Sequence, residues 1–281
     1  MSFLILYLIF IFGIALSASI SCCYKEEMIV EAHKLLSGNG NDNDNSKFTS
    51  AMIIPNHTIS WAVYQTIDGN EGIDARFYKF NNTQIDSNFY AQIVIPKIDK
   101  FVNFTPSLIL LEPKSYAVKD NGNTIVIKDN KSISSSNAHD TFPFGIPTNY
   151  QIMINKDYNA TLPSPTIYEP FTQTSYWERQ EINSKLDELG TYYIIVYNSY
   201  DNSDNNIQQQ NSIKFGKFSL AVGKVEDFSI LDILVLIPYS WINVKLFFND
   251  YWSLIVGVTI FVFLVIVIPI VLVLRKKRKS N

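Results

Sequence analysis

One long apolar run near the C-terminus sets the organisation of the chain. Residues 253–274 contain about 22 residues without a single charge. A helix rises 1.5 Å per residue, so this run is long enough to cross the hydrocarbon core of a bilayer. Five basic residues follow it, and the positive-inside rule puts such a cluster on the cytosolic side. The pattern predicts one transmembrane helix with a short cytosolic tail, residues 275–281. The alternative is a buried core helix.

A second apolar run lies at the N-terminus. Residues 3–16 are apolar, and small residues follow at positions 15–19. This pattern is typical of a secretory signal peptide, which we expect to span residues 1–21 with cleavage between positions 17 and 21. A retained anchor is the alternative, although the run is short for a full span. Together with the C-terminal span, a signal peptide predicts a single-pass type I membrane protein.

Residues 228–248 form a third apolar stretch, which polar residues interrupt. These residues are Asp232, Pro238, Asn243 and Lys245. A charge near the centre of a bilayer costs about 2.5 to 3.5 kcal/mol on insertion scales. We therefore interpret residues 225–252 as a juxtamembrane segment that lies in the membrane interface, and not as a second span.

Between these segments, residues 48–224 show short alternating runs separated by turn residues, which is the pattern of β-strands. The expected strands are residues 58–66, 75–80, 90–96, 107–111, 124–128, 150–154, 192–197 and 217–222. No helical pattern connects most of them, so the sequence predicts a β-sandwich. Residues 177–189 fit either a strand or a helix.

The run from Gly190 to Tyr197 is apolar on both faces. Successive side chains of a strand point to opposite sides, so Tyr192, Ile194 and Val196 share one face. The other face carries two tyrosines and Ile195. A strand covered on both sides lies in the middle of a sheet, and we expect that place for this one.

Residues 22–47 form an N-terminal segment of a different character. Residues 24–36 have a modest helical pattern, and residues 37–46 are a polar, Asn- and Asp-rich tract that we interpret as a linker. Cys22 and Cys23 are the only cysteines, and adjacent cysteines cannot staple a fold. The exported domain is therefore expected to be held together by its core alone.

Composition and charge agree with an exported β domain. Aromatic residues make up 14% of the chain, which favours strands. The net charge is −3, and removing the five basic residues of the tail leaves −8 for the rest. Nucleic acid is therefore excluded as a partner for the exported part.

Several of these strands resemble the bacterial pre-peptidase C-terminal domain, a small jelly-roll sandwich. The resemblance is carried by residues 74–80 (DARFYKF), 107–113 (SLILLEP), 189–196 (LGTYYIIV) and 216–222 (GKFSLAV). Arg76 stands where that family's strand has a second acidic residue, and residues 114–165 intervene between the matching blocks. The resemblance implies a jelly-roll-like ectodomain that acts as a binding or accessory module without catalysis.

Candidate catalytic and metal-binding residues are few. His33, His57 and His139 are scattered, and the chain has no His-Glu-x-x-His motif, glycine-rich phosphate loop or Gly-x-Ser-x-Gly elbow. We therefore expect no enzymatic activity and no cofactor. The strongest metal candidate places oxygen ligands at Asp68, Asn70 and Asp74, as a Ca²⁺ loop would. The alternative is an ordinary hairpin turn, which would contain Asp-Gly and Asn without any metal and which we favour.

Two sets of residues concern modification and targeting. Sequons for N-glycosylation begin at Asn56, Asn81, Asn103, Asn130 and Asn159. Lys277 and Lys279 occupy the fifth and third places from the end, which resembles a dilysine signal for return to the endoplasmic reticulum. A plain stop-transfer cluster accounts for the same lysines.

These patterns predict a single-pass type I protein in the endoplasmic reticulum or plasma membrane. Its expected partners are the lipid bilayer and a protein or glycan ligand. A β-sandwich that acts as a binding or adhesion module presents its loops to this ligand. The alternative is a membrane-anchored accessory or hydrolytic enzyme whose site carries no recognisable motif. The absence of a paired nucleophile and base motif favours the binding module.

Overall fold

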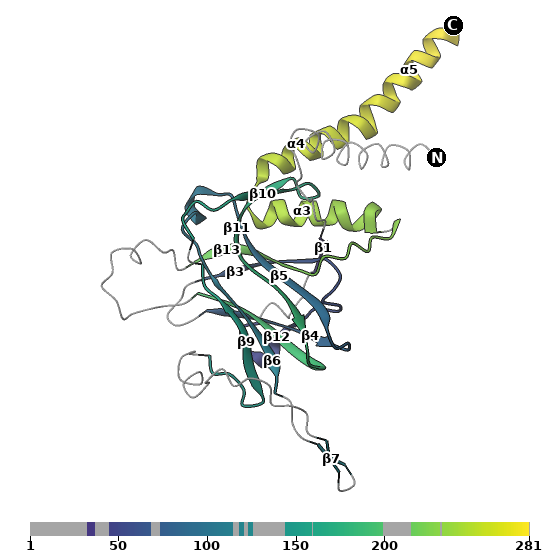
Figure 1. Ribbon diagram of the computed structural model, residues 1–281. Coiled ribbons are helices and arrows are strands. Elements are labelled where there is room, and N and C mark those ends of the chain that lie inside the picture. Colours follow the sequence, from purple (N-terminus) through teal and green to yellow (C-terminus); the bar gives the residue numbers. More distant parts are fainter. Residues whose placement is uncertain are drawn as a thin grey trace. The chain divides into compact units, whose positions relative to one another are not determined.

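The chain folds into two compact units, seen in a computed structural model that describes residues 33–36, 45–68, 74–114, 118–120, 123–125, 144–158, 160–198, 215–230 and 232–280. The sandwich unit comprises Leu36–Thr166 and Trp177–Val225. The helical unit comprises Met1–Leu35, Ile167–Tyr176 and Glu226–Asn281. Each unit is described by itself below (Figure 1).

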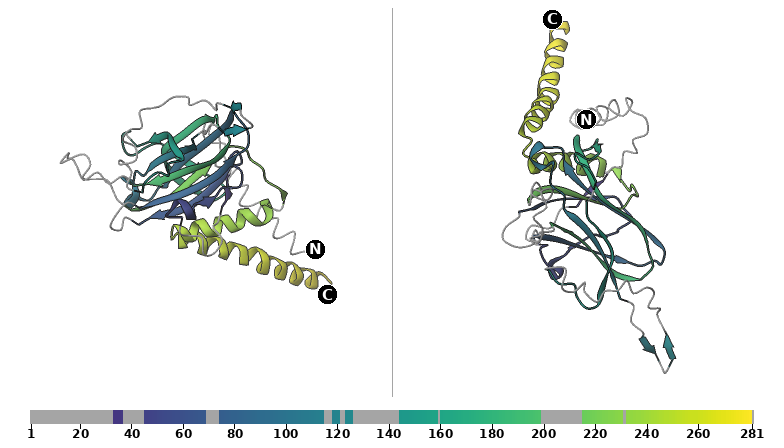
Figure 2. Two further views of the ribbon diagram at one scale, coloured as in Figure 1. Left: turned by 90° about the horizontal axis from the view of Figure 1, so that it is seen from below. Right: turned by 60° about the vertical axis from the view of Figure 1, so that its left-hand side comes forward.

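The sandwich unit is mainly β and contains two sheets (Figures 1 and 2). Its strands are β2 (Met52–Ile53), β3 (Trp61–Ile67), β4 (Ala75–Asn82), β5 (Ser87–Pro96), β6 (Ser107–Pro113), β9 (Tyr150–Lys156), β11 (Thr174–Leu186), β12 (Gly190–Tyr197) and β13 (Gly216–Val222). Strand β11 belongs to this unit from Trp177 onward. The β5 sheet has the order β3-β13-β5-β11 within this unit, and the β12 sheet has the order β2-β4-β12-β6-β9. The expectation of a mainly β fold built as a sandwich is confirmed.

Smaller elements complete this unit. The 3-10 turns are η1 (Phe48–Ser50) and η2 (Asp99–Phe101), and a separate ribbon pairs β7 (Val118–Asp120) with β8 (Asn123–Ile125). The first residues of the sandwich pattern thus form η1 and not a strand. Strand β2 is short and runs parallel to β4, whereas the long neighbours β4, β12 and β6 are antiparallel.

The main core lies between the two sheets, and alternation along each strand builds it. On β12, Tyr192, Ile194 and Val196 belong to this core together with side chains from the β5 sheet such as Ile93 and Leu220. All five are buried. Strand β12 pairs with β4 on one side and β6 on the other, so the central position expected from its sequence is confirmed.

A second cluster covers the outer face of the β12 sheet. Here Ile195 of β12 packs with Phe77, and two aromatic residues from outside the long strands cover them. The Phe48 ring lies 4.6 Å from the Phe77 ring, and the Phe144 ring lies 5.6 Å from it in an edge-on arrangement. The β12 sheet is therefore buried on both faces, which explains the continuous apolar character of its central strand.

The structure shows the secondary structure of three regions for which the sequence pattern was ambiguous or indicated something different. The stretch that fitted a helix or a strand is the strand β11. Residues 114–165, which separate the blocks resembling the pre-peptidase domain, contain β9, an edge strand of the β12 sheet. The helix expected over residues 24–36 does not extend to Lys34 and Leu35, which form β1 (Lys34–Leu35). Most of that segment lies outside the described residues.

The helical unit contains the C-terminal elements. They are η3 (Asp232–Leu236), α3 (Ile237–Phe247), α4 (Tyr251–Val262), η4 (Phe263–Val267) and α5 (Ile268–Ser280), and the unit also holds β10 (Thr166–Glu169) from Ile167 onward. Both η3 and η4 are π-helical turns. Within the described part of the chain, no helix combines the length and the apolar character required to span a membrane.

Polar contacts inside the helical unit involve the charges that interrupt the apolar stretch of residues 228–248. The Lys245 ammonium donates to the Gln173 carbonyl at 3.0 Å and lies 3.2 Å from an Asp250 carboxylate oxygen. Asp250 also caps α4 by accepting from the Ser253 amide. Asp232 pairs with Lys34 at 3.0 Å. Each charge of this stretch therefore has a partner within its own unit.

Candidate functional site

Three connections of the sandwich unit start or finish at the same end of its strands, which we call the loop end. The pairings Ile67↔Gly216 and Ala75↔Tyr197 bring together the residues from which the β3–β4 and β12–β13 connections leave. Tyr197 also pairs with Ser107, where the β5–β6 connection ends. The described residues of the loop end are therefore those at the end of β3, around η2 and at the start of β4, β6 and β13.

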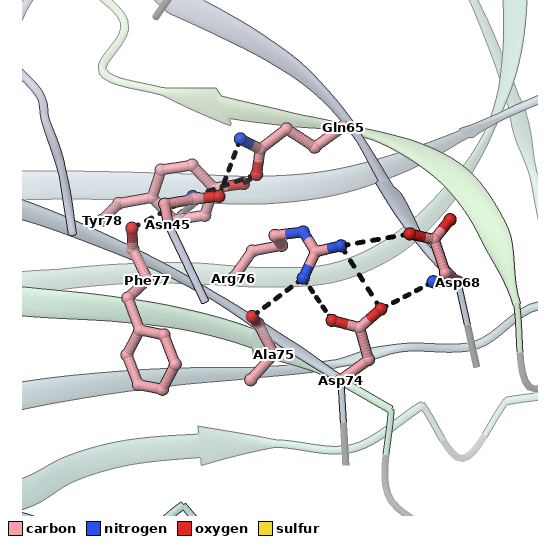
Figure 3. Close-up of polar contacts among 8 residues, drawn as sticks. All are labelled: Asn45, Gln65, Asp68, Asp74, Ala75, Arg76, Phe77 and Tyr78. Carbon is pink, nitrogen blue, oxygen red and sulfur yellow. Dashed lines mark hydrogen bonds and ion pairs between the residues drawn. The ribbon is translucent and has the colours of Figure 1, made fainter. Parts of the chain in front are cut away.

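A charged cluster of the loop end surrounds Arg76 (Figure 3). The Arg76 guanidinium binds the Asp74 carboxylate through both of its terminal nitrogens, with Nη2 at 3.3 Å from Oδ2. Asp68 lies 3.8 Å from Nη2, and its side chain is 59% exposed. The Asp68 amide donates to the Asp74 carboxylate at 2.7 Å, which joins the end of β3 to the start of β4.

A buried polar network supports this cluster from behind (Figure 3). The Asn45 side chain exchanges hydrogen bonds of 3.0 and 3.1 Å with the Gln65 amide, and it donates to the Phe77 carbonyl. The Tyr78 hydroxyl donates to Gln65 Oε1 at 2.6 Å. Burial raises the pKa of Tyr78, so its hydroxyl keeps its proton and acts as a donor. The network fixes β3 against β4 beneath the ion pair.

The arrangement bears on the metal site considered from the sequence. Asp68 and Asp74 lie close together, but Arg76 occupies the space between their carboxylates, where a cation would otherwise bind. Asn70 lies outside the described residues. Among the residues that the structure describes, no group of three or more His, Cys, Asp or Glu side chains is arranged to hold a metal ion. The Arg76 side chain supplies the positive charge of this cluster.

Cationic and apolar side chains also belong to the loop end. Lys217, at the start of β13, has a pKa lowered by partial burial and by the neighbouring charge of Lys100. Both lysines therefore place positive charge in the same region. Phe215 precedes β13 and is 56% exposed. An exposed aromatic ring beside cations is suited to contact a polar ligand that has an apolar face.

Arg179 holds the β5–β6 connection in place at the loop end. Its Nε donates to the Phe104 carbonyl at 3.0 Å, and Nη2 donates to the Val102 carbonyl at 2.9 Å. Its guanidinium also donates to the Ser164 hydroxyl and lies 5.1 Å from the Tyr158 ring. Burial lowers the pKa of Arg179 to about 10, which leaves it charged at neutral pH. This residue was missed in the sequence, because its partners come from segments far from it in the chain.

The opposite end of the sandwich brings a serine and a histidine together. Ser87 Oγ lies 3.4 Å from His57 Nε2, but the hydroxyl donates its one proton to Asn82 Oδ1 at 2.7 Å. The His57 ring packs against the Phe80 ring at 4.7 Å. Because the Ser87 proton is directed at Asn82, the contact between Ser87 and His57 is not arranged as a nucleophile–base pair. The pair anchors a turn, and the hydrolytic alternative stays a prediction.

Acid is expected to weaken the sandwich through His57. Burial lowers the pKa of His57, so the unfolded chain, with a histidine pKa of about 6.5, binds a proton before the folded chain does. Stability therefore falls as the pH drops below about 6.5, by up to about 1.4 kcal/mol per pH unit. Urea unfolding of the wild type and of His57→Gln at pH 7 and pH 5 measures this effect. Parallel losses in both proteins would show that His57 is not the cause.

The candidate modification and targeting residues fall in different places. Asn56 is exposed, and its side-chain oxygen accepts hydrogen bonds from the amide and hydroxyl of Thr58, the third residue of its sequon. Asn81 is exposed on β4, and Asn103 is partly exposed next to η2. Asn130 and Asn159 lie outside the described residues. Lys277 is exposed on α5, and Lys279 lies on the same helix.

No family model and no curated protein sequence matches the chain. The function proposed below is therefore inferred from the residues of the loop end and of the helical unit. These residues comprise the Arg76 ion-pair cluster, the neighbouring lysines and Phe215, and the apolar surfaces of the C-terminal helices. Of the residues singled out from the sequence, Asp68 and Asp74 are brought together, whereas His33 and His57 belong to different units.

Proposed function

We propose that the protein is a single-pass type I membrane protein that displays a β-sandwich as a binding or adhesion module. The observation that carries this proposal is a difference in the exposure of apolar side chains between the sandwich unit and the C-terminal helices. The sandwich unit buries most of its large apolar side chains in two clusters, whereas most of the described apolar side chains of α4 and α5 are exposed. Exposed apolar helix surfaces of this extent mark contact with lipid or with another protein.

The membrane anchor is supported by the continuity of the C-terminal helices. From Tyr251 to Ser280, α4, η4 and α5 follow one another without a non-helical residue between them. The π-helical turn η4 ends just before Pro269, whose missing N–H interrupts the regular hydrogen-bond pattern. Residues 253–274 would measure about 33 Å as one helix, close to the hydrocarbon thickness of about 30 Å. Tyr251 and Trp252 are exposed where such a helix enters the interface.

The sandwich is best interpreted as a jelly roll. Its eight long strands form two groups of four, β3-β13-β5-β11 and β4-β12-β6-β9. In each group the early strands are paired with late ones, as in a double Greek key. This order supports the resemblance to the pre-peptidase C-terminal domain, in which the corresponding module binds and does not catalyse. Jelly rolls commonly use the loops at one end or one face for recognition.

We assign ligand contact to the loop end. It presents an exposed carboxylate on Asp68, positive charge from Lys100 and Lys217, and the exposed ring of Phe215. Arg179 and the Asn45 network hold the underlying backbone rigid, which lowers the entropic cost of binding. A protein or glycan surface with mixed charge suits this set of groups. The lumenal or extracellular location follows from the predicted topology.

Binding is tested with the full chain reconstituted in fluorescent liposomes and added to cultured cells. Cells are left untreated, treated with protease, or treated with glycosidases, which separates protein ligands from glycan ligands. We expect liposome binding that one of the two treatments removes. Phe215→Ser should reduce binding about tenfold, which corresponds to about 1.4 kcal/mol and is the scale of an interface hot spot.

The matched control is Ile85→Ser, because Ile85 is 63% exposed in the turn between β4 and β5 at the opposite end. It should bind as the wild type does. Equal losses in both variants, or no liposome binding to any cells, would overturn the binding module. The anchor is tested separately by alkaline carbonate extraction of cell membranes. The full chain should stay in the membrane pellet, and a chain ending at Trp252 should be released.

A further inference from the structure

Helix α3 is apolar on two opposite faces, although only one of them is covered. Ile237, Trp241, Val244 and Phe248 are buried. The residues at the intervening positions are exposed, with Tyr239 at 50%, Ile242 at 46% and Leu246 at 48%. Their spacing of three and four residues places them on one side of the helix. We call these three residues the outer stripe.

None of the charged residues near α3 belongs to the outer stripe. The charged residues between positions 232 and 250 are Asp232, Lys245 and Asp250. Lys245 is buried on the covered face, where it donates to Gln173 and pairs with Asp250. Asp232 pairs with Lys34. A soluble helix places its charges on the exposed side, so this helix has the opposite arrangement.

A close contact fixes α3 against α4. The Trp241 ring packs on Gly257, where an added methyl group would lie only 2.7 Å from the ring. Trp241 is also held by a hydrogen bond from its Nε1 to Gln173 Oε1. Gly257 is six residues beyond Tyr251, so the contact lies about 9 Å further along the helix axis.

From these contacts we propose that the outer stripe of α3 lies in the acyl-chain boundary of the lipid bilayer, so that the membrane contact includes α3 as well as the span. This inference rests on the proposed membrane anchor. If Tyr251 and Trp252 lie at the headgroup level, the Trp241–Gly257 contact lies about 9 Å deeper, within the 5 to 10 Å to which interfacial helices are buried. The exposed stripe then faces acyl chains, and the paired charges stay on the covered side.

The inference is tested with an environment-sensitive fluorophore on single cysteines in the full chain, after Cys22 and Cys23 are replaced by serine. The probe is placed at Ile242→Cys, and at Leu246→Cys as a second stripe position. Ile260→Cys on α4 reports on the anchor, and Ile85→Cys in the sandwich unit is the aqueous control. Each protein is reconstituted in phosphatidylcholine and phosphatidylserine vesicles with and without lipids that carry a quenching nitroxide near the headgroup end of the acyl chain.

We expect a blue-shifted emission at Ile242 and Leu246, with nitroxide quenching at least half as strong as at Ile260 and none at Ile85. A blue shift at Ile242 without lipid quenching would mean that another polypeptide, such as a second copy of this chain, covers the stripe. An aqueous probe at Ile242 beside a quenched probe at Ile260 would overturn the inference and leave the anchor intact. An aqueous probe at Ile260 would refute the anchor, and the lipid contact of α3 with it.

Discussion

Replacing Gly223 with alanine is expected to cost the sandwich about 4 kcal/mol or more, a large part of the roughly 5 to 15 kcal/mol by which native domains are stable. Gly223 has φ +75°, and a methyl group added there would lie 2.2 Å from the Ile59 carbonyl oxygen. The backbone cannot move aside easily. Lys224 and Val225 both donate to the Thr58 carbonyl, at 3.1 and 2.9 Å, and Gly223 donates to the Tyr90 carbonyl. The side chain would therefore collide with a main chain that is fixed on both sides.

Gly145 offers a matched control for the steric part of this prediction. It also has a positive φ, of +59°, but a methyl group added there would meet nothing within 4 Å. Gly145→Ala should therefore lose only the cost of a left-handed conformation, about 1 to 2 kcal/mol. Urea unfolding of the full chain in detergent micelles, followed by far-ultraviolet circular dichroism, compares the two. Equal losses would mean that backbone conformation alone sets the effect at Gly223.

Strand positions and burial could be predicted from the sequence where they depend on local alternation. Strand β12 shows this well, because Tyr192 and Tyr193 point to different faces and both faces are apolar. The apolar residues on both faces predict the central place of this strand in its sheet without any information on the neighbouring strands. It could not give the neighbours themselves, since the pairing of β12 with β4 and β6 joins residues about a hundred positions apart.

The candidate site was harder to predict because its contacts are not local. The pattern suggested Asp68 and Asp74 as metal ligands, and it marked Arg76 only as a departure from the family's acidic residue. In the fold Arg76 lies on the same side as Asp74 and binds it. Likewise, Phe48 and Phe144 carry no sign in the sequence that they cover one sheet together. Such roles are set by packing between distant segments.

The helical unit shows the limit of hydropathy as a guide. Lys245 in an apolar stretch argues against a second membrane span, because an unpaired charge is costly to remove from water. The structure removes that cost by giving the ammonium a carbonyl, a hydroxyl and a carboxylate within one unit. A hydropathy scale scores each residue alone and therefore cannot include these partners. It identifies the apolar run but not the face on which the charge lies.

Phe80 is at the centre of an aromatic cluster in the main core. Its ring stacks on the Phe89 ring at 5.2 Å and on the Tyr192 ring at 5.4 Å, with interplanar angles of 12° and 10°. The His57 ring packs against it at 4.7 Å. The Phe80 side chain therefore joins three strands, of which β4 and β12 belong to one sheet and β5 to the other. Removing this ring would leave a cavity that its rigid neighbours cannot fill.

Phe80→Ala is accordingly expected to lower the free energy of unfolding by about 3 to 5 kcal/mol, whereas Phe80→Leu, which keeps most of the volume, should cost roughly 1 to 2 kcal/mol. Urea unfolding at pH 7 measures both.

A second result follows from His57, whose pKa is lowered by the burial that Phe80 helps to provide. Water entering the cavity of Phe80→Ala would bring the His57 pKa back toward 6.5, so this variant should lose less stability than the wild type between pH 7 and pH 5. Equal costs for alanine and leucine at pH 7, or an unchanged acid sensitivity in Phe80→Ala, would contradict a core that depends on this ring stack.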